Sequence, residues 1–337
     1  MMWQDHAAGF FEVAQETPLF IPMSGYETPI VVFPEAFLTA YTACIHRGIT
    51  SDDGLKDALQ ARDISRLQAY LTQVLLPIPH ETPNYSGMLT AYYSPALTGS
   101  LTRTDHFRWP LLKRLPKTWM EKSRHDIEQC HDALAEADYA LCWVHDPIDA
   151  FFLDVQGSGM IRLETDQGPV ERWVAWDGTN DPAYQSLGKS LLQDPDHRDN
   201  LPATLDAETL KDYLRQHKNG RELLTRNPSK IFYQWSKTAG PTTASGINAS
   251  PLATLAVDVT HVALGQIVLT SFVSIDRKNV HLLALAIDTG SAIKGAHRAD
   301  LYLGAGQAAF AHAGQFQHPC CLQVLHVKAG ESCGAVT

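Results

Sequence analysis

The sequence predicts a mainly β protein in which short helices lie at the periphery of barrels or sandwiches. Short runs of β-branched and aromatic residues recur along the chain, each bounded by Gly, Pro or Asp. The segment LLALAI at 282–287 is apolar at every position, which is typical of a strand buried on both faces. Helical patterns are few and short. Closed or stacked sheets with a few covering helices fit these observations best.

The expected strands are 29–33, 88–93, 139–145, 151–156, 160–164, 266–275 and 282–287. The clearest helix has Ile64, Leu67, Leu71, Val74 and Leu75 on one face. Asp63 is its expected cap, and Pro77 and Pro79 end it. Weaker helical patterns lie at 127–137, 210–214, 223–224 and 307–313.

The length of 337 residues exceeds the size at which one hydrophobic core usually stops growing, so two domains are expected. Segments rich in Gly, Ser and Thr at 98–110 and 236–249 are the candidate boundaries. Lys and Arg number 27 against 37 Asp and Glu, a formal charge of −10. This balance argues against a nucleic-acid partner and favours a saccharide or peptide.

The sequence shows no pattern typical of a signal peptide or of a membrane-spanning helix. No apolar run approaches the roughly 18–20 residues of a spanning helix. The first fifteen residues have neither a basic start nor an apolar core typical of a signal peptide. The residues alone therefore leave the location open.

The six cysteines are too scattered for a disulfide scaffold, so isolated buried thiols are expected. A small loop closed by Cys320 or Cys321 with Cys333 is the exception to consider. The metal candidates are His125, Cys130, His131, Cys142 and His145. Only Cys142 and His145 have the spacing of a zinc ligand pair, so no metal site is expected. Complete nucleotide-binding and serine-hydrolase motifs are absent from the sequence.

The acidic residues Asp288 and Asp300 are the candidates for chemistry. Asp288 follows the buried strand within Ala-Ile-Asp-Thr-Gly-Ser, which is the active-site signature of aspartic peptidases. That chemistry needs two such carboxylates, and the sequence holds one copy. Glycoside cleavage also uses two carboxylates in one groove. Twelve extended residues would separate them by about 40 Å, so the chain must double back, which Gly290 and Gly295 permit.

The segment DTGSAIKGAHRADLYLG at 288–304 closely resembles the signature of the membrane-bound lytic murein transglycosylase A family, MltA. Further motifs follow in the family's order: LTAYYSP at 89–95, FFLDVQGSGMIRL at 151–163, YQSLGKSLL at 184–192, NPSKIFYQW at 227–235 and LAVDVTHVALG at 255–265. Ser94, Ser291 and Ala263 depart from the family pattern, which commonly has Glu, Gly and Pro there. The resemblance covers about residues 88–313.

The resemblance implies a double-psi β-barrel catalytic domain formed by both chain ends, residues 1–100 and 237–337. A second β-barrel, residues 101–236, is inserted and lines the substrate groove. The implied reaction is that of a carbon–oxygen lyase. It cleaves the β-1,4 bond between N-acetylmuramic acid and N-acetylglucosamine of peptidoglycan without water and forms a 1,6-anhydro product. No cofactor and no nucleic acid are implied, and a periplasmic location with outer-membrane attachment is expected by analogy.

The resemblance also implies roles for individual residues. Asp300 matches the catalytic aspartate, which acts first as acid and then as base. Asp288 matches its hydrogen-bonding or electrostatic partner. Arg298 would lower the pKa of Asp300 while the apolar residues 301–303 would raise it, so the residues alone leave open which aspartate is the acid.

Seven further residues are expected to bind substrate: Thr289, Gly290, Lys294, Tyr93, Gln156, Gly157 and Ser158. Tyr93, or its neighbour Tyr92, could stack on a sugar. Gln156 and Ser158 could bind hydroxyl or acetamido groups, and Lys294 could meet the lactyl carboxylate or the peptide stem. An aspartic peptidase and a noncatalytic glycan-binding relative are the alternative functions.

Overall fold

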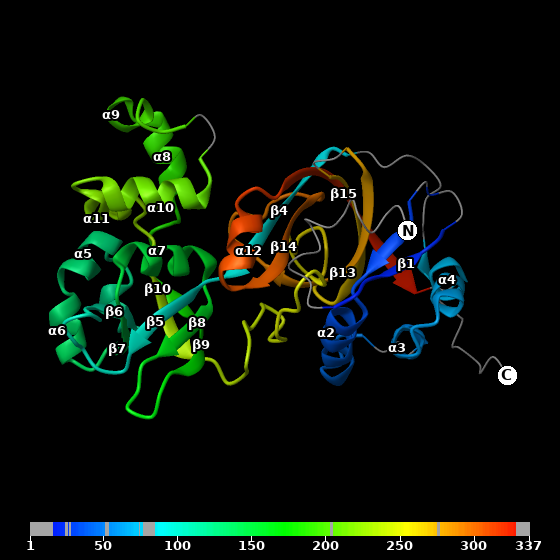
Figure 1. The fold of residues 1–337 in the computed structure, drawn as a ribbon, viewed down its shortest axis with the longest axis horizontal. Helices are drawn as coiled ribbons and strands as arrows, with labels where there is room; N and C mark the ends of the chain where they lie inside the picture. The colour runs from blue at the N-terminus through cyan, green and yellow to red at the C-terminus, as the bar shows by residue number, and fades with distance from the viewer. Residues whose placement is uncertain are drawn as a thin grey trace. The chain divides into compact units, whose positions relative to one another are not determined.

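A computed structural model of the chain describes residues 16–23, 26, 28–50, 54–73, 75–76, 85–202, 205–274 and 277–327. It divides into two compact units (Figure 1). Unit 1 contains the described residues up to Tyr92, Thr242–Gly304 and those from Phe316 onward. Unit 2 is Tyr93–Pro241 with Ala305–Gln315. Each unit has its own sheet and its own hydrophobic clusters.

Unit 1 is built on a closed ring of six strands. They are β4 (Gly87–Ser94), β11 (Thr254–Val257), β12 (Gln266–Val273), β13 (Asn279–Thr289), β14 (Arg298–Ala305) and β15 (Gln317–Val327). Their order is β13-β11-β14-β4-β15-β12, and β12 pairs back onto β13. Strands β11 and β13 run parallel, whereas β14 is antiparallel to β11. The expected barrel formed by both parts of the chain is confirmed.

Helices α2 (Pro34–His46), α3 (Gly54–Gln60) and α4 (Ile64–Gln73) belong to the same unit. Three more strands extend the sheet: β1 (Leu19–Ile21), β2 (Ile30–Val32) and β3 (Leu75–Leu76). Phe37, Tyr41 and Leu71 from the helices cluster with Leu285 and Ile287 of β13. Because side chains alternate along a strand, Ala286 and Asp288 face the opposite side of β13. The run 282–287 is buried at every position, as predicted.

Unit 2 contains a second sheet of six strands: β5 (Ala96–Ser100), β6 (Trp109–Leu112), β7 (Ala140–Val144), β8 (Gly159–Leu163), β9 (Val170–Thr179) and β10 (Ile231–Trp235). Their order is β10-β9-β8-β5-β7-β6. The end strands β6 and β10 contribute Leu112 and Phe232 to one apolar cluster, so the sheet curls toward a barrel. Strand β5 pairs with β7 and β8, which places the unit boundary before residue 96 rather than near residue 100.

The described helices of unit 2 are short. They are η1 (Lys117–Trp119), α5 (Arg124–Gln129), α6 (His131–Glu136), α7 (Pro147–Gln156), α8 (Leu187–Gln193), α9 (Pro195–Arg198), α10 (Ala207–Gln216), α11 (Gly220–Leu223), η2 (Leu224–Arg226) and α12 (Gly306–Ala313). Within the described ranges, no helix has the length and apolar character needed to cross a membrane.

The prediction of a strand at 151–156 is wrong, because these residues form the second half of α7. Asp146 caps the helix by accepting a hydrogen bond from the Ile148 amide at 2.8 Å, and Pro147 occupies the first turn. Gly157 ends the helix in the left-handed conformation, with φ of 78°. Residues 150–154 are all buried. The sequence therefore showed neither the 3.6-residue period of a half-buried helix nor the two-residue period of a half-buried strand.

The other predicted strands are present, with small differences at their ends. Helix α4 ends at Gln73, and Leu75 lies in β3, so the predicted continuation of the helix to Leu75 is wrong. Val74, Pro77 and Pro79 lie outside the described residues. The predicted cap is confirmed, since Asp63 accepts a hydrogen bond from the Arg66 amide at 3.0 Å.

Candidate active site

The two aspartates of the Asp-Thr-Gly segment lie on strands that flank the same third strand. Asp288 on β13 and Asp300 on β14 both pair with Ala256 on β11. Cross-strand partners point to the same face of a sheet, and neighbouring strands are about 4.8 Å apart. The two aspartates therefore share one face with their α-carbons about 10 Å apart. Ala256, whose side chain is a single methyl group, lies on the strand between them.

Asp288 is held by three hydrogen bonds. Its Oδ1 accepts from the backbone amides of Ala244 and Thr289, both at 2.9 Å. Its Oδ2 accepts from the Tyr92 hydroxyl at 2.8 Å. Burial raises the pKa of Asp288, and these three donors act in the opposite direction. Since both oxygens are occupied, the side chain has a fixed orientation and suits an electrostatic or orienting role.

Asp300 is held at one oxygen only. Thr90 Oγ1 donates to its Oδ1. Among the described residues, no group donates to Oδ2, so this oxygen can carry a proton or contact a ligand. Burial raises the pKa of Asp300, and the charge of Asp288 adds to the increase. The hydrogen bond from Thr90 and the charge of Arg298 lower the pKa, but the net direction is upward.

Arg298 does not form an ion pair with Asp300. Its Nη1 donates to the carbonyl oxygens of Met88, at 3.4 Å, and of Ala299. The guanidinium is therefore directed at backbone groups, and burial decides the pKa of Asp300. Both aspartates have raised pKa values, so the pKa direction alone does not choose the acid. The unoccupied oxygen of Asp300 is what distinguishes the two.

Three partners of the aspartates were missed by the sequence reasoning: Thr90, Tyr92 as a hydrogen-bond donor, and Ala244. Thr90 and Tyr92 alternate on β4 and lie on the same face, a signal that was visible in LTAYYSP. Burial and the nearby Asp288 raise the pKa of Tyr92 well above its ordinary value, so the phenol remains a donor. Its ring packs 5.1 Å from that of Tyr302. Tyr92 therefore positions Asp288.

The loop between the aspartates carries Thr289, Gly290 and Lys294. Thr289 and Lys294 are exposed, and Gly290 is half-buried. Asp258 anchors the loop by accepting a hydrogen bond from the Gly295 amide at 2.8 Å. This bond and those from Thr260 lower the pKa of Asp258 to about 2. Gly295 has a φ of 112°, a conformation that favours glycine, so its place in the turn is structural.

The remaining predicted binding residues belong to unit 2. Tyr93 is buried, with its ring 5.2 Å from that of Phe310. Within the described part of the chain, its hydroxyl has no hydrogen-bond partner. Gln156 and Ser158 are half-buried on either side of Gly157, where α7 ends. The turn packs beside the segment that follows Tyr93, since the Met160 amide donates to Pro95 O at 2.8 Å.

The described residues contain no group of three or more His, Cys, Asp or Glu side chains arranged to hold a metal ion. His131, one of the metal candidates, packs its ring against Trp109 with the ring centres 4.4 Å apart. Cys44, Cys130, Cys142, Cys320 and Cys321 are free thiols. The suggested pairing with Cys333 involves a residue outside the described ranges.

Comparison with known proteins assigns the family. Residues 88–234 match the MltA specific insert domain, and residues 253–326 match the 3D domain. Membrane-bound lytic murein transglycosylase A of Escherichia coli K12 is 30% identical over 256 residues, covering 73% of this chain and 68% of that protein. The chain belongs to the membrane-bound lytic murein transglycosylase A family. The family member of Vibrio cholerae is 30% identical over 241 residues, covering 68% and 63% of the two chains.

Solved structures of lytic transglycosylases share this fold. E. coli MltA with bound chitohexaose superposes with a TM-score of 0.73 at 23% identity, covering 92% of this chain and 91% of that one. The lytic transglycosylase LtgG of Burkholderia pseudomallei has a TM-score of 0.61 at 26% identity, covering 94% and 96%. The family and fold implied by the sequence motifs are confirmed, and the chain is an enzyme of the lytic transglycosylase class.

Proposed function

We propose that this MltA family member cleaves the β-1,4 bond between N-acetylmuramic acid and N-acetylglucosamine in peptidoglycan, with Asp300 as the only proton donor and acceptor. The observation that carries this proposal is the difference between the two aspartates. Asp300 has a raised pKa and one oxygen to which no described residue donates, whereas both oxygens of Asp288 are occupied. An acid must begin protonated, which burial of Asp300 favours.

In the first step, protonated Asp300 gives its proton to the glycosidic oxygen while the bond from that oxygen to the muramic C1 breaks. The N-acetylglucosamine end departs as an alcohol. The muramic ring then carries oxocarbenium-like positive charge. Asp288, held by Tyr92, Ala244 and Thr289, supplies fixed negative charge on the same face of the barrel.

In the second step, the Asp300 carboxylate takes the proton of the muramic C6 hydroxyl, and O6 forms a bond to C1. The product is a 1,6-anhydro ring, and Asp300 is protonated again for the next cycle. The atoms balance without water, because O6 replaces the departing oxygen at C1. One group can serve both steps, since an acid that has lost its proton is a base.

The two units take different parts in this proposal. Unit 1 is the catalytic domain, because it holds both aspartates and the loop with Thr289, Gly290 and Lys294. Unit 2 binds substrate through Tyr93 and the turn at 156–158. The E. coli relative was solved with a chitohexaose, which supports glycan strands as the ligand here. The membrane-bound relatives support a place in the cell envelope, and we assign the chain to the periplasmic side with outer-membrane attachment.

The test is digestion of purified murein sacculi, with the products identified by mass spectrometry. We expect 1,6-anhydro-muropeptides from the wild-type chain and none above background from Asp300→Asn. Asp105→Asn, at an exposed aspartate of unit 2, is the matched control and should act like wild type. Products with free reducing ends would mean a hydrolase, and cleaved peptides would mean an aspartic peptidase. Binding to sacculi without any product would mean a noncatalytic relative.

A further inference from the structure

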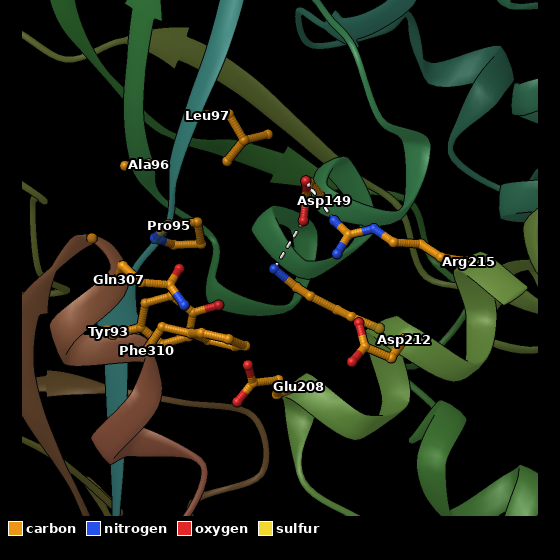
Figure 2. Close-up of a pocket in the computed structure, with 12 residues that line it drawn as sticks. Tyr93, Pro95, Ala96, Leu97, Asp149, Glu208, Asp212, Arg215, Gln307 and Phe310 are labelled. Carbon is orange, nitrogen blue, oxygen red and sulfur yellow. Dashed lines mark hydrogen bonds and ion pairs between the residues drawn. The ribbon is translucent and has the colours of Figure 1, made fainter.

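Unit 2 contains a cavity of about 350 Å³ that the aspartate chemistry does not use (Figure 2). Its walls come from four parts of this unit: the segment 93–97 from the end of β4 to the start of β5, the first turn of α7, one face of α10 and the first half of α12. Tyr93, Gln307 and Phe310 lie on one side of the cavity, while Asp149 and Arg215 lie opposite (Figure 2). This volume suits a small ligand or a short peptide segment.

The two cations of the cavity wall are already paired. Lys211 Nζ lies 2.9 Å from Asp149 Oδ1 and 4.7 Å from the centre of the Phe310 ring. Arg215 bridges two carboxylates, with Nη2 at 2.9 Å from Asp149 and also 2.9 Å from Asp146. These carboxylates neutralise both cations, so the cavity offers little attraction to an anion.

Two carboxylates of the wall remain without a cation. Glu208 and Asp212 are exposed, lie one turn apart on α10 and line the cavity. In the described part of the chain, no ion pair joins either of them to a Lys, Arg or His. Like charges at this helical spacing repel each other. A cationic ligand between the two side chains would offset that repulsion. It would also neutralise the excess negative charge of the cavity wall, where Asp149, Glu208 and Asp212 face Lys211 and Arg215.

Tyr93 adds a second and independent indication of a ligand. Its side chain is only 5% exposed and lines the cavity, and its hydroxyl has no hydrogen-bond partner among the residues that the structure describes. A buried hydroxyl without a partner lowers the stability of the fold, and a ligand that accepts its hydrogen bond would remove this cost. Burial raises the pKa of Tyr93, and the negative charge of Asp149 on the opposite wall raises it further. A ligand in the cavity would lie beside the Tyr93 side chain, which carries this hydroxyl.

We propose that this cavity binds a diamino acid residue of the peptide attached to muramic acid, with its free ammonium group between Glu208 and Asp212. This inference rests on the proposed function, because that peptide is part of the peptidoglycan substrate. The aliphatic part of the residue packs on Phe310, and a peptide carbonyl accepts a hydrogen bond from the Tyr93 hydroxyl. A neutral sugar would leave both carboxylates unpaired, and a carboxylate ligand would be repelled.

The direct test measures binding by calorimetry to the Asp300→Asn chain. The probe is a synthetic tetrapeptide that contains a diamino acid with a free side-chain ammonium group. The comparison is the same peptide with that amine acetylated. We expect the acetylated peptide to bind at least about tenfold more weakly, since hydrogen bonds to charged groups contribute about 1.5–3 kcal/mol. Adding Glu208→Gln and Asp212→Asn should remove this difference, whereas Glu171→Gln, at an exposed acid on β9, should keep it.

Tyr93→Phe should weaken both peptides to a similar extent. Equal affinity of the Asp300→Asn chain for the free and acetylated peptides, or no binding of either, would overturn the proposal. A chitooligosaccharide that binds instead, with affinity lowered by Tyr93→Phe, would make the cavity a sugar subsite. Turnover of peptide-free glycan strands by the wild-type chain reports the proposed function separately. If the Asp300→Asn chain binds the free and acetylated peptides equally while the wild-type chain still cleaves peptide-free glycan strands, only the role of the cavity is refuted.

Discussion

Asp154 lies in a buried charge cluster of unit 2, and neutralising it should destabilise this unit strongly. Its Oδ2 lies 2.8 Å from Lys230 Nζ and 2.8 Å from Arg124 Nη1. Its Oδ1 accepts from the Tyr233 hydroxyl at 2.7 Å. The Lys230 and Arg124 side chains are 0% and 1% exposed, so water cannot solvate the two cations once the carboxylate charge is lost. Glu128, which also pairs with Arg124, would be the remaining carboxylate of the cluster.

The substitution Asp154→Asn keeps the shape and leaves an amide oxygen facing the cations, so its cost is mainly electrostatic. Removing one partner of a buried ion pair costs about 3–5 kcal/mol. For a unit of about 150–250 residues, that corresponds to a fall in Tm of roughly 6–20 °C. Six of the seven tryptophans lie between residues 109 and 235. Tryptophan fluorescence during thermal or urea unfolding therefore reports on unit 2.

The matched control is Asp132→Asn, which removes a pair with Arg103 at 3.2 Å in which the aspartate side chain is 70% exposed. Exposed pairs contribute about 0–1 kcal/mol, so Tm should change little. Combining Asp154→Asn with Lys230→Met should recover part of the loss, because one unpaired cation is then removed. A loss below about 1 kcal/mol for Asp154→Asn would refute the reasoning.

Three further predictions concern the site and the stability of unit 2. Thr90→Val removes a hydrogen bond that lowers the pKa of Asp300, so the alkaline limb of kcat/KM against pH should move to higher pH; a move to lower pH would contradict the acid role. Burial lowers the pKa of His131 to about 2, so its contribution to stability is present above the unfolded value of about 6.5 and is lost as pH falls below it. His131→Phe should therefore flatten the decrease in unfolding free energy between pH 6.5 and 4 in urea titrations, and an unchanged slope would count against this cause. Gly220→Ala places a Cβ only 1.8 Å from Leu214 O, so tryptophan-monitored unfolding should show a loss of at least about 1–3 kcal/mol, the usual cost of overpacking. A wild-type Tm for this variant would show that α11 can move to make room.

Local patterns in the sequence predicted most strands, because β-branched runs between turn residues mark strands whatever their partners are. They also drew attention to Asp288 and Asp300, and the ordered motifs assigned the family. The segment 151–156 shows where such patterns fail. A helix buried on nearly every side has the same apolar run as a buried strand, so only its caps at Asp146 and Gly157 distinguish it.

The sequence by itself determined the family, the fold class and the pair of candidate aspartates, since each depends on residues that are neighbours along the chain. Only the tertiary structure decided which aspartate has an unoccupied oxygen, because Thr90, Tyr92 and Ala244 reach the pair from distant positions in the chain. The register of the barrel strands also brings the two aspartates together, because both pair with Ala256 on the strand between them. The physical reason is that hydrogen bonds and desolvation act through space, and strand pairing sets those distances.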